Sequence, residues 1–155
     1  MKKFIFTGMV IGWLIGSGAG AAPLQQSGTL TTMEGDPLHL SSFEGKPLVI
    51  IFWANWCVPC RKEVAHLNKL YQGMFPHLNF IGINEDEKLE EGLAFIERYR
   101  PHYQSIKDDK FSWAEAMNVN SLPQLIVLSA SGEEVYRGIE PPSLNKLQRL
   151  VEEEK

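Results

Sequence analysis

The sequence predicts an α/β fold, in which a central mixed β-sheet is flanked by helices on both faces and preceded by a short β extension. The apolar run at 48–54 has no polar alternation, which is typical of a strand buried on both faces. Short apolar strands alternate with segments of helical periodicity, and this order favours helices packed on both sides of one sheet. The 155 residues suffice for one domain with its own core, and no internal repeat is expected.

The first half of the domain contains two of the predicted strands and a long helix. Gly35-Asp36 indicates a turn, and the alternation at 38–40 indicates a short strand after it. The buried strand at 48–54 leads into a helix after Pro59, whose apolar residues recur at helical spacing until Gly73. Another short buried strand is predicted at 80–83.

The second half adds a helix, a hairpin and a closing helix. Acidic residues 85–87 precede an amphipathic helix at 89–99, and we expect their charge to favour its first turn. A short helix is predicted around 111–117, and a hairpin over 125–136 with its turn at Ser131-Gly132. Apolar residues at helical spacing predict the last helix at 144–151.

The N-terminal segment has the features of a signal peptide. Lys2 and Lys3 precede an apolar run from about 4 to 16, and small residues of the kind signal peptidase requires follow. We therefore expect a signal peptide over 1–21 and a domain over 22–155, exported to the periplasm. The apolar run is shorter than the ~20 residues that span a bilayer. An uncleaved anchor is the alternative, and membrane attachment is expected only if this segment is retained.

Charge and cysteine content narrow the function classes. The net charge is −4 and no basic block is present, so nucleic-acid binding is not expected. The only two cysteines, Cys57 and Cys60, lie three positions apart in a chain expected in a disulfide-permissive compartment. A structural disulfide is one interpretation, but so small a loop stabilises a fold little. The pair fits a redox couple better.

The segment from Trp53 to Cys60 carries the predicted chemistry, because it lies where a buried strand passes into a helix. The first cysteine would sit at the helix N-terminus, where unpaired N–H groups and the dipole favour the thiolate. Such sites have thiol pKa values of about 3.5–7.5. Cys57 would attack a client disulfide and Cys60 would then release the client from it. Pro59 fixes the backbone between them.

Zinc is the other interpretation of a cysteine pair. It requires about four ligands, and the sequence contains no second pair. The histidines are interpreted as surface or turn residues: His39, His66, His77 and His102. No metal and no cofactor is expected.

Several motifs together carry a family resemblance. They are Gly45-Lys46-Pro47, the apolar strand, Trp56-Cys57-Val58-Pro59-Cys60-Arg61-Lys62-Glu63, Leu122-Pro123, Gly132 and Gly138. With them the chain resembles the TlpA/ResA/DsbE-like branch of the thioredoxin superfamily, from about Gly28 onward. The resemblance implies a thioredoxin fold and a protein-disulfide oxidoreductase that uses Cys57 and Cys60 as its redox disulfide.

The resemblance also implies substrate-binding residues. Pro123 corresponds to the cis-proline that the family places beside the active site, where Leu122 would offer its backbone to a substrate peptide in strand fashion. Trp56 would pack beside Cys57, with plain core filling as the alternative. Gln124 stands where the family usually has Thr, which leaves the substrate preference open.

Glu63 is implied as a third catalytic residue. Cytoplasmic-type thioredoxins have a buried Asp where this chain has Ile51, and the exported branch has a Glu at the position of Glu63. It lies three residues after Cys60, so both can share a helix face. The carboxylate would accept the Cys60 proton; a solvated helix-face Glu is the alternative.

The expected function is the reduction of specific periplasmic protein disulfides, in cytochrome c maturation or in copper-handling clients. The resemblance implies a membrane electron donor of the DsbD/CcdA type. A thiol oxidase would use the same residues, and a non-catalytic copper-binding or client-binding module is a further alternative. A thiol peroxidase fits less well, because Asn55 and Trp56 stand where it would need Thr and Arg neighbours.

Overall fold

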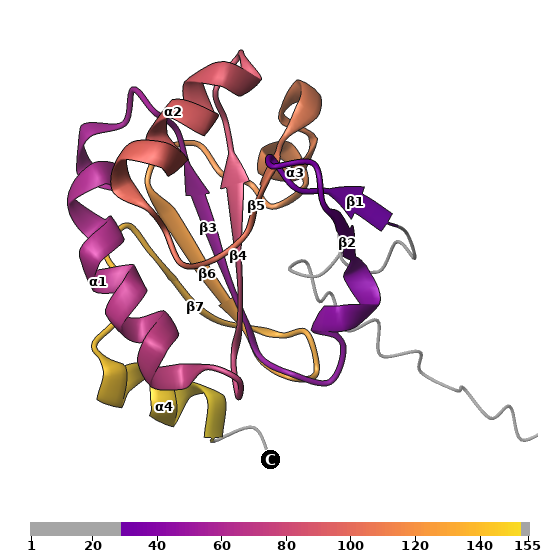
Figure 1. Cartoon of the computed structure of the whole chain (residues 1–155). Helices are drawn as coiled ribbons and strands as arrows, with labels where there is room; N and C mark the ends of the chain where they lie inside the picture. The colour runs from indigo at the N-terminus through magenta and orange to yellow at the C-terminus, as the bar shows by residue number, and fades with distance from the viewer. Residues whose placement is uncertain (1–28, 153–155) are drawn as a thin grey trace, which may run out of the picture.

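The computed structural model describes residues 29–152, which form a five-stranded mixed sheet with helices on both faces (Figure 1). The strand order is β5-β4-β3-β6-β7. The strands are β3 (Leu48–Trp53), β4 (Asn79–Asn84), β5 (Ser105–Lys107), β6 (Gln124–Leu128) and β7 (Glu134–Gly138). The first three run parallel, whereas β6 is antiparallel to β3 and β7 is antiparallel to β6.

β3 is the central strand, and all six of its residues are buried. Its alternate side chains enter two separate cores, because successive residues of a strand point to opposite faces. Val49, Ile51 and Trp53 pack with α1 (Val58–Met74), α2 (Leu89–Tyr99) and α4 (Leu144–Glu152). Leu48, Ile50 and Phe52 pack on the other face with α3 (Ser112–Ala116) and the N-terminal segment. The predicted fold class is confirmed.

The predicted N-terminal β extension is also present. β1 (Thr29–Thr31) pairs antiparallel with β2 (Pro37–His39), and Met33 N–H donates to Ser105 O at 2.8 Å, which attaches the extension to β5. The strand expected at 38–40 ends at His39, because a 3₁₀ helix, η1 (Leu40–Phe43), begins there.

The acidic residues 85–87 lie elsewhere than expected. The first turn of α2 carries Glu90 and Glu91, whereas Glu85 and Asp86 are buried just beyond the end of β4. The physical reason is that Glu85 N–H still donates to Trp53 O, at 2.9 Å, so the β ladder continues past β4 and holds this segment against β3.

The predicted signal peptide at 1–21, like residues 22–28, lies outside the described residues. Within 29–152, none of the helices combines the length and the apolar character needed to cross a bilayer.

Candidate active site

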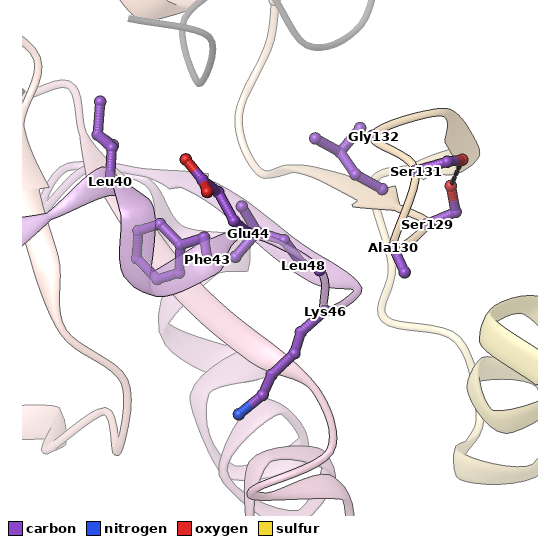
Figure 2. A pocket seen from close by; sticks show the side chains of 11 residues that line it. Leu40, Phe43, Glu44, Lys46, Leu48, Ser129, Ala130, Ser131 and Gly132 are labelled. Atoms are coloured by element: carbon purple, nitrogen blue, oxygen red, sulfur yellow. Dashed lines mark hydrogen bonds between the residues drawn. The ribbon is translucent and has the colours of Figure 1, made fainter. Parts of the chain in front are cut away.

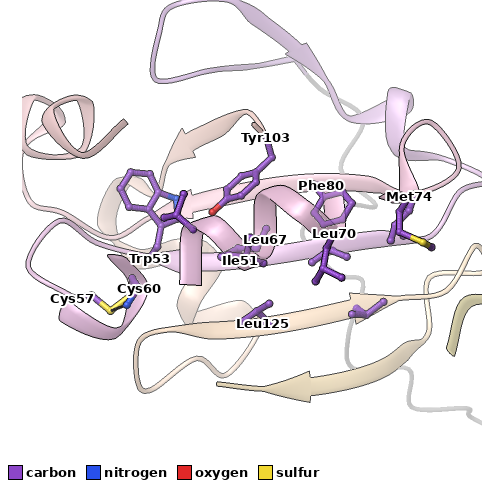
Figure 3. Close-up of a cluster of buried hydrophobic side chains, with 14 of the residues drawn as sticks. Ile51, Trp53, Cys57, Cys60, Leu67, Leu70, Met74, Phe80, Tyr103 and Leu125 are labelled. Atoms are coloured by element: carbon purple, nitrogen blue, oxygen red, sulfur yellow. Dashed lines mark hydrogen bonds between the residues drawn. A yellow bond between two sulfur atoms is a disulfide. The ribbon is translucent and has the colours of Figure 1, made fainter. Parts of the chain in front are cut away.

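Cys57 and Cys60 form a disulfide at the junction of β3 and α1, with their Cα atoms 5.3 Å apart. Cys57 is the N-cap of α1, with non-helical φ −76° and ψ 99°, and Pro59 follows in the first turn. Proline suits this position, because the first N–H groups of a helix have no intrahelical acceptor. The sulfurs lie at one end of the core that also contains Trp53, Ile51 and Leu67 (Figure 3).

The helix N-terminus is directed at one of the two sulfurs. Cys60 N–H donates to Cys57 Sγ at 3.2 Å. An unpaired helix N–H and the positive end of the dipole both stabilise negative charge. We expect the same arrangement to favour a thiolate at Cys57 in the reduced protein, which would make Cys57 the better nucleophile.

The disulfide is sheltered, and its neighbours are exposed. Each cysteine is only 3% exposed, whereas Trp56 is 64% exposed and Val58 55%. These two apolar side chains flank Cys57 in the chain, and exposed apolar surface beside a reactive group is a feature of protein interaction sites. A polypeptide that approaches Cys57 would cover these two side chains.

The loop between β3 and the cysteines is braced from β4. Asn55 N–H donates to both carboxylate oxygens of Asp86, and Asn84 Nδ2 donates to Asp86 Oδ2 at 2.7 Å. Arg61 of α1 donates from its guanidinium to Asn55 O, with Nε at 3.0 Å. Both the N–H and the C=O of Asn55 are therefore held by charged side chains.

Sequence reasoning missed Asp86, and it did not predict that Arg61 of the active-site motif would contact Asn55. The signal was the polar run that directly follows the buried strand β4. Parallel strands end at the same edge of a sheet, so a carboxylate after β4 lies beside the loop after β3.

Pro123 precedes β6, and the Leu122–Pro123 peptide bond is cis, as the resemblance implied. The register places Gln124 opposite Phe52, near the end of β3 from which the cysteine loop departs. Gln124 Nε2 donates to Gly138 O at 2.9 Å, so this side chain is attached to β7. Phe75–Pro76 is a second cis bond, which the sequence did not predict.

Glu63 lies on α1 one turn beyond Cys60. Its side chain is 28% exposed, and Glu63 Oε2 is 3.8 Å from His66 Nδ1. The carboxylate is thus half-buried beside a histidine, and its role in proton transfer stays a prediction.

A groove of about 530 Å³ adjoins the site, and both Trp56 and Leu122 line it. Glu85 also lines this groove, although the residue is only 6% exposed. Burial, and secondarily the neighbouring Asp108 carboxylate, raises the pKa of Glu85 to about 8, while Lys107 acts in the opposite direction. Glu85 is therefore protonated at neutral pH unless a cation approaches.

Another pocket, of about 200 Å³, lies between η1 and the β6–β7 turn. Leu48, the first residue of β3, lines it together with Phe43 and Ser129 (Figure 2). The cysteines follow the last residue of β3, so this pocket is at the opposite end of the strand from the disulfide. No group of three or more metal-ligating side chains is present in the part of the chain that the structure describes.

The sheet order, the disulfide at the start of α1 and the cis-proline before β6 together define a thioredoxin-fold protein. The chain belongs to the thioredoxin-like family, whose model matches residues 45–134.

Curated relatives include the thiol-disulfide oxidoreductase ResA of Halalkalibacterium halodurans, 30% identical over 106 residues. The match covers 67% of this chain and 60% of ResA. The soluble secreted antigen MPT53 of Mycobacterium tuberculosis is 29% identical over 109 residues, covering 70% of this chain and 62% of MPT53. This chain thus matches roughly three fifths of the length of these relatives.

Solved structures with the same fold include a secreted Mycobacterium tuberculosis disulfide oxidoreductase homologous to Escherichia coli DsbE. It has a TM-score of 0.67 and 25% identity, covering 80% of this chain and 93% of its own. A thiol-disulfide oxidoreductase from Bacteroides fragilis gives a TM-score of 0.70 and 26% identity, covering 80% of this chain and 96% of its own. The predicted resemblance to the ResA/DsbE-like branch is confirmed.

Proposed function

We propose that this chain is an exported thiol–disulfide oxidoreductase that reduces the disulfides of specific client proteins through Cys57 and Cys60. The observation that carries the proposal is the hydrogen bond from Cys60 N–H to Cys57 Sγ at the start of α1. A sulfur placed there is stabilised as a thiolate, the form that attacks disulfides.

The reaction consists of two exchanges. Cys57 thiolate attacks one sulfur of the client disulfide; the client S–S bond breaks, and the other client sulfur leaves as a thiolate that takes a proton from water. Cys60 then loses its proton and attacks Cys57 Sγ, which breaks the mixed disulfide and forms the Cys57–Cys60 bond; the remaining client sulfur leaves as a thiolate and takes a proton from water. Two electrons pass from the protein dithiol to the client.

Glu63 is the proposed acceptor of the Cys60 proton in the second exchange. It lies one turn beyond Cys60 on the same helix, half-buried and next to His66. A positioned carboxylate that takes a proton in the transition state speeds such steps by about 10²–10⁴-fold.

Client binding is assigned to Trp56, Leu122 and Pro123. Trp56 offers an exposed apolar surface directly before Cys57, and Leu122 lines the same groove. The backbone of Leu122 would pair with an extended client segment in the manner of an added strand. Such pairing places the client sulfur beside Cys57 without depending on the client's sequence.

The oxidised form must be reduced again before another turnover. A membrane dithiol protein of the DsbD/CcdA type is the proposed electron donor, and the proposed compartment is the periplasm. Proteins of cytochrome c maturation or copper handling are the proposed clients. The leader at 1–21 and the secreted relative MPT53 support export.

Trapping of the mixed disulfide tests the proposal. In the Cys60→Ala variant the first exchange occurs and the second cannot, so client proteins should stay linked to Cys57 until dithiothreitol is added. The Cys57→Ala variant is the matched control and should trap far less. Equal trapping by both variants, or none by either, would contradict the proposal. A measured reduction potential well above about −200 mV would instead indicate an oxidase.

A further inference from the structure

The groove beside Trp56 contains charge that the exchange reaction does not use. Residues of the loop after β4 and of the α3 region line it, and we call it the acidic groove. Its lining residues are Trp56, Glu85, Glu87, Phe111, Ala114, Glu115, Val119, Asn120, Ser121 and Leu122. Three of them are acidic residues and none is Lys, Arg or His. The groove therefore combines apolar walls with uncompensated acidic groups.

Lys107, the basic side chain that acts on Glu85, makes contacts outside the groove. Lys107 Nζ donates to Asp86 O at 2.7 Å and lies 4.0 Å from the exposed Asp109 carboxylate. Lys107 does not line the groove. Its positive charge therefore neutralises the acidic groups of the groove only in part.

Glu85 provides an independent sign of a missing partner. Its Oε1 is buried without a hydrogen-bond partner, and no other buried side-chain oxygen or nitrogen of the described residues shares that condition. The neighbouring Asp108 shares a side-chain hydrogen bond with the Glu85 carboxyl group, and its carboxylate also accepts from the N–H groups of Trp113 and Ala114 and from Ser112 Oγ. A buried carboxyl oxygen without a donor costs stability, and a ligand that brings a donor removes that cost.

We propose that the acidic groove binds a lysine or arginine side chain of the client polypeptide, near the disulfide that Cys57 attacks. The inference rests on the proposed function and adds a substrate class to it. The aliphatic stem of the basic residue would lie on Phe111, Val119 and Leu122, and its cationic end would reach Glu85 and Glu115. On binding, Glu85 would release its proton to water and pair as a carboxylate with the cation.

Synthetic peptides test this inference. Each contains one intramolecular disulfide and differs from its partner only in Lys or Gln, placed in turn at positions on either side of the cysteines. The measurement is the second-order rate of peptide reduction by the reduced full chain at pH 7 and low salt. At the best position we expect the Lys peptide to react about tenfold faster than the Gln peptide. Added KCl should reduce that ratio.

Variants assign the preference to the groove. Glu85→Gln combined with Glu115→Gln should lower the Lys/Gln ratio to about twofold or less. Glu133→Gln, an exposed carboxylate at the far end of the sheet, should leave the ratio unchanged. The uncharged hydroxyethyl disulfide should be reduced equally by all these proteins, which shows that each is folded and active.

Three results separate the possible failures. Equal rates for Lys and Gln peptides at every position in the wild type would overturn the inference while leaving the proposed function intact. A ratio that persists in the double variant would also overturn it. If neither the peptides nor hydroxyethyl disulfide were reduced at all, the proposed function itself would fail.

Discussion

The N–H of Asn55 donates to both carboxylate oxygens of Asp86, at 3.0 and 2.9 Å. The two residues are 31 positions apart in the sequence and join the loop before Cys57 to the end of β4. Asp86 is 1% exposed, so hydrogen bonds from the protein, and not water, stabilise its carboxylate. The position of the catalytic loop relative to the sheet depends on this contact.

Replacement of Asp86 by Asn tests that dependence. The Asn side chain keeps the size of Asp but turns one acceptor into a donor that opposes Asn55 N–H. We expect the free energy of unfolding to fall by about 1–3 kcal/mol, and disulfide exchange to slow as the loop loosens. Urea unfolding and the exchange rate with hydroxyethyl disulfide measure both effects.

Asp109→Asn is the matched control for that variant. The Asp109 side chain is 89% exposed and faces Lys107 at 4.0 Å, so its removal should change stability by less than about 0.5 kcal/mol. An equal loss of stability in both variants would contradict the claim that the hydrogen bonds of Asp86 to the loop before Cys57 stabilise the fold.

Glu85 makes stability depend on pH. Its pKa is raised from 4.5 to about 8 in the folded chain, so between these values the folded state holds a proton that the unfolded state has lost. The free energy of unfolding therefore decreases as pH rises through this interval, by about 2–4 kcal/mol from this group.

Glu85→Gln should remove that contribution, because the amide does not titrate. Urea unfolding of the wild type and the variant between pH 4.5 and 8.5 gives the difference directly. The variant should gain stability relative to the wild type as pH rises, whereas Glu133→Gln should follow the wild type. Parallel curves for Glu85→Gln and the wild type would rule out a buried protonated carboxyl.

Glu63→Gln tests the proposed proton acceptor. Resolution of the mixed disulfide by Cys60 should slow at least about tenfold, with the attack of Cys57 unchanged, because only the second exchange requires the Cys60 proton to leave. Rapid-quench separation of the two steps, repeated across pH, measures the effect. Glu97→Gln on the exposed side of α2 should react like the wild type. Equal slowing of both exchanges would indicate a structural role.

The sequence was sufficient for the architecture because its signals are local. The uninterrupted apolar run of β3 and the proline after Cys57 each mark an element without knowledge of the rest of the chain. β5 was not predicted, because its three residues, Ser105–Lys107, are too few to show the alternation of apolar and polar residues that indicates a strand. It forms because it pairs with β4, a contact between distant segments.

The same distinction separates the predicted and the missed parts of the site. Cys57 and Cys60 are adjacent in sequence, and the helix that joins them sets their geometry. Asp86 reaches Asn55 only after two parallel strands have aligned, so its partner could not be identified from the sequence. Glu85 was expected at a helix start. That expectation was wrong, because Glu85 is buried against Asp108, and this contact depends on the chain segment beyond β5.

The most direct measurement is the pKa of the Cys57 thiol in the reduced protein, obtained from the pH dependence of its alkylation by iodoacetamide. Placement at the N-cap of α1 predicts a value below about 7.5, against about 8.5 for a free cysteine. Cys60, which lies within the first turn of α1 and not at its N-cap, should react much more slowly. A Cys57 thiol that titrates near 8.5 and reacts no faster than Cys60 would contradict the account.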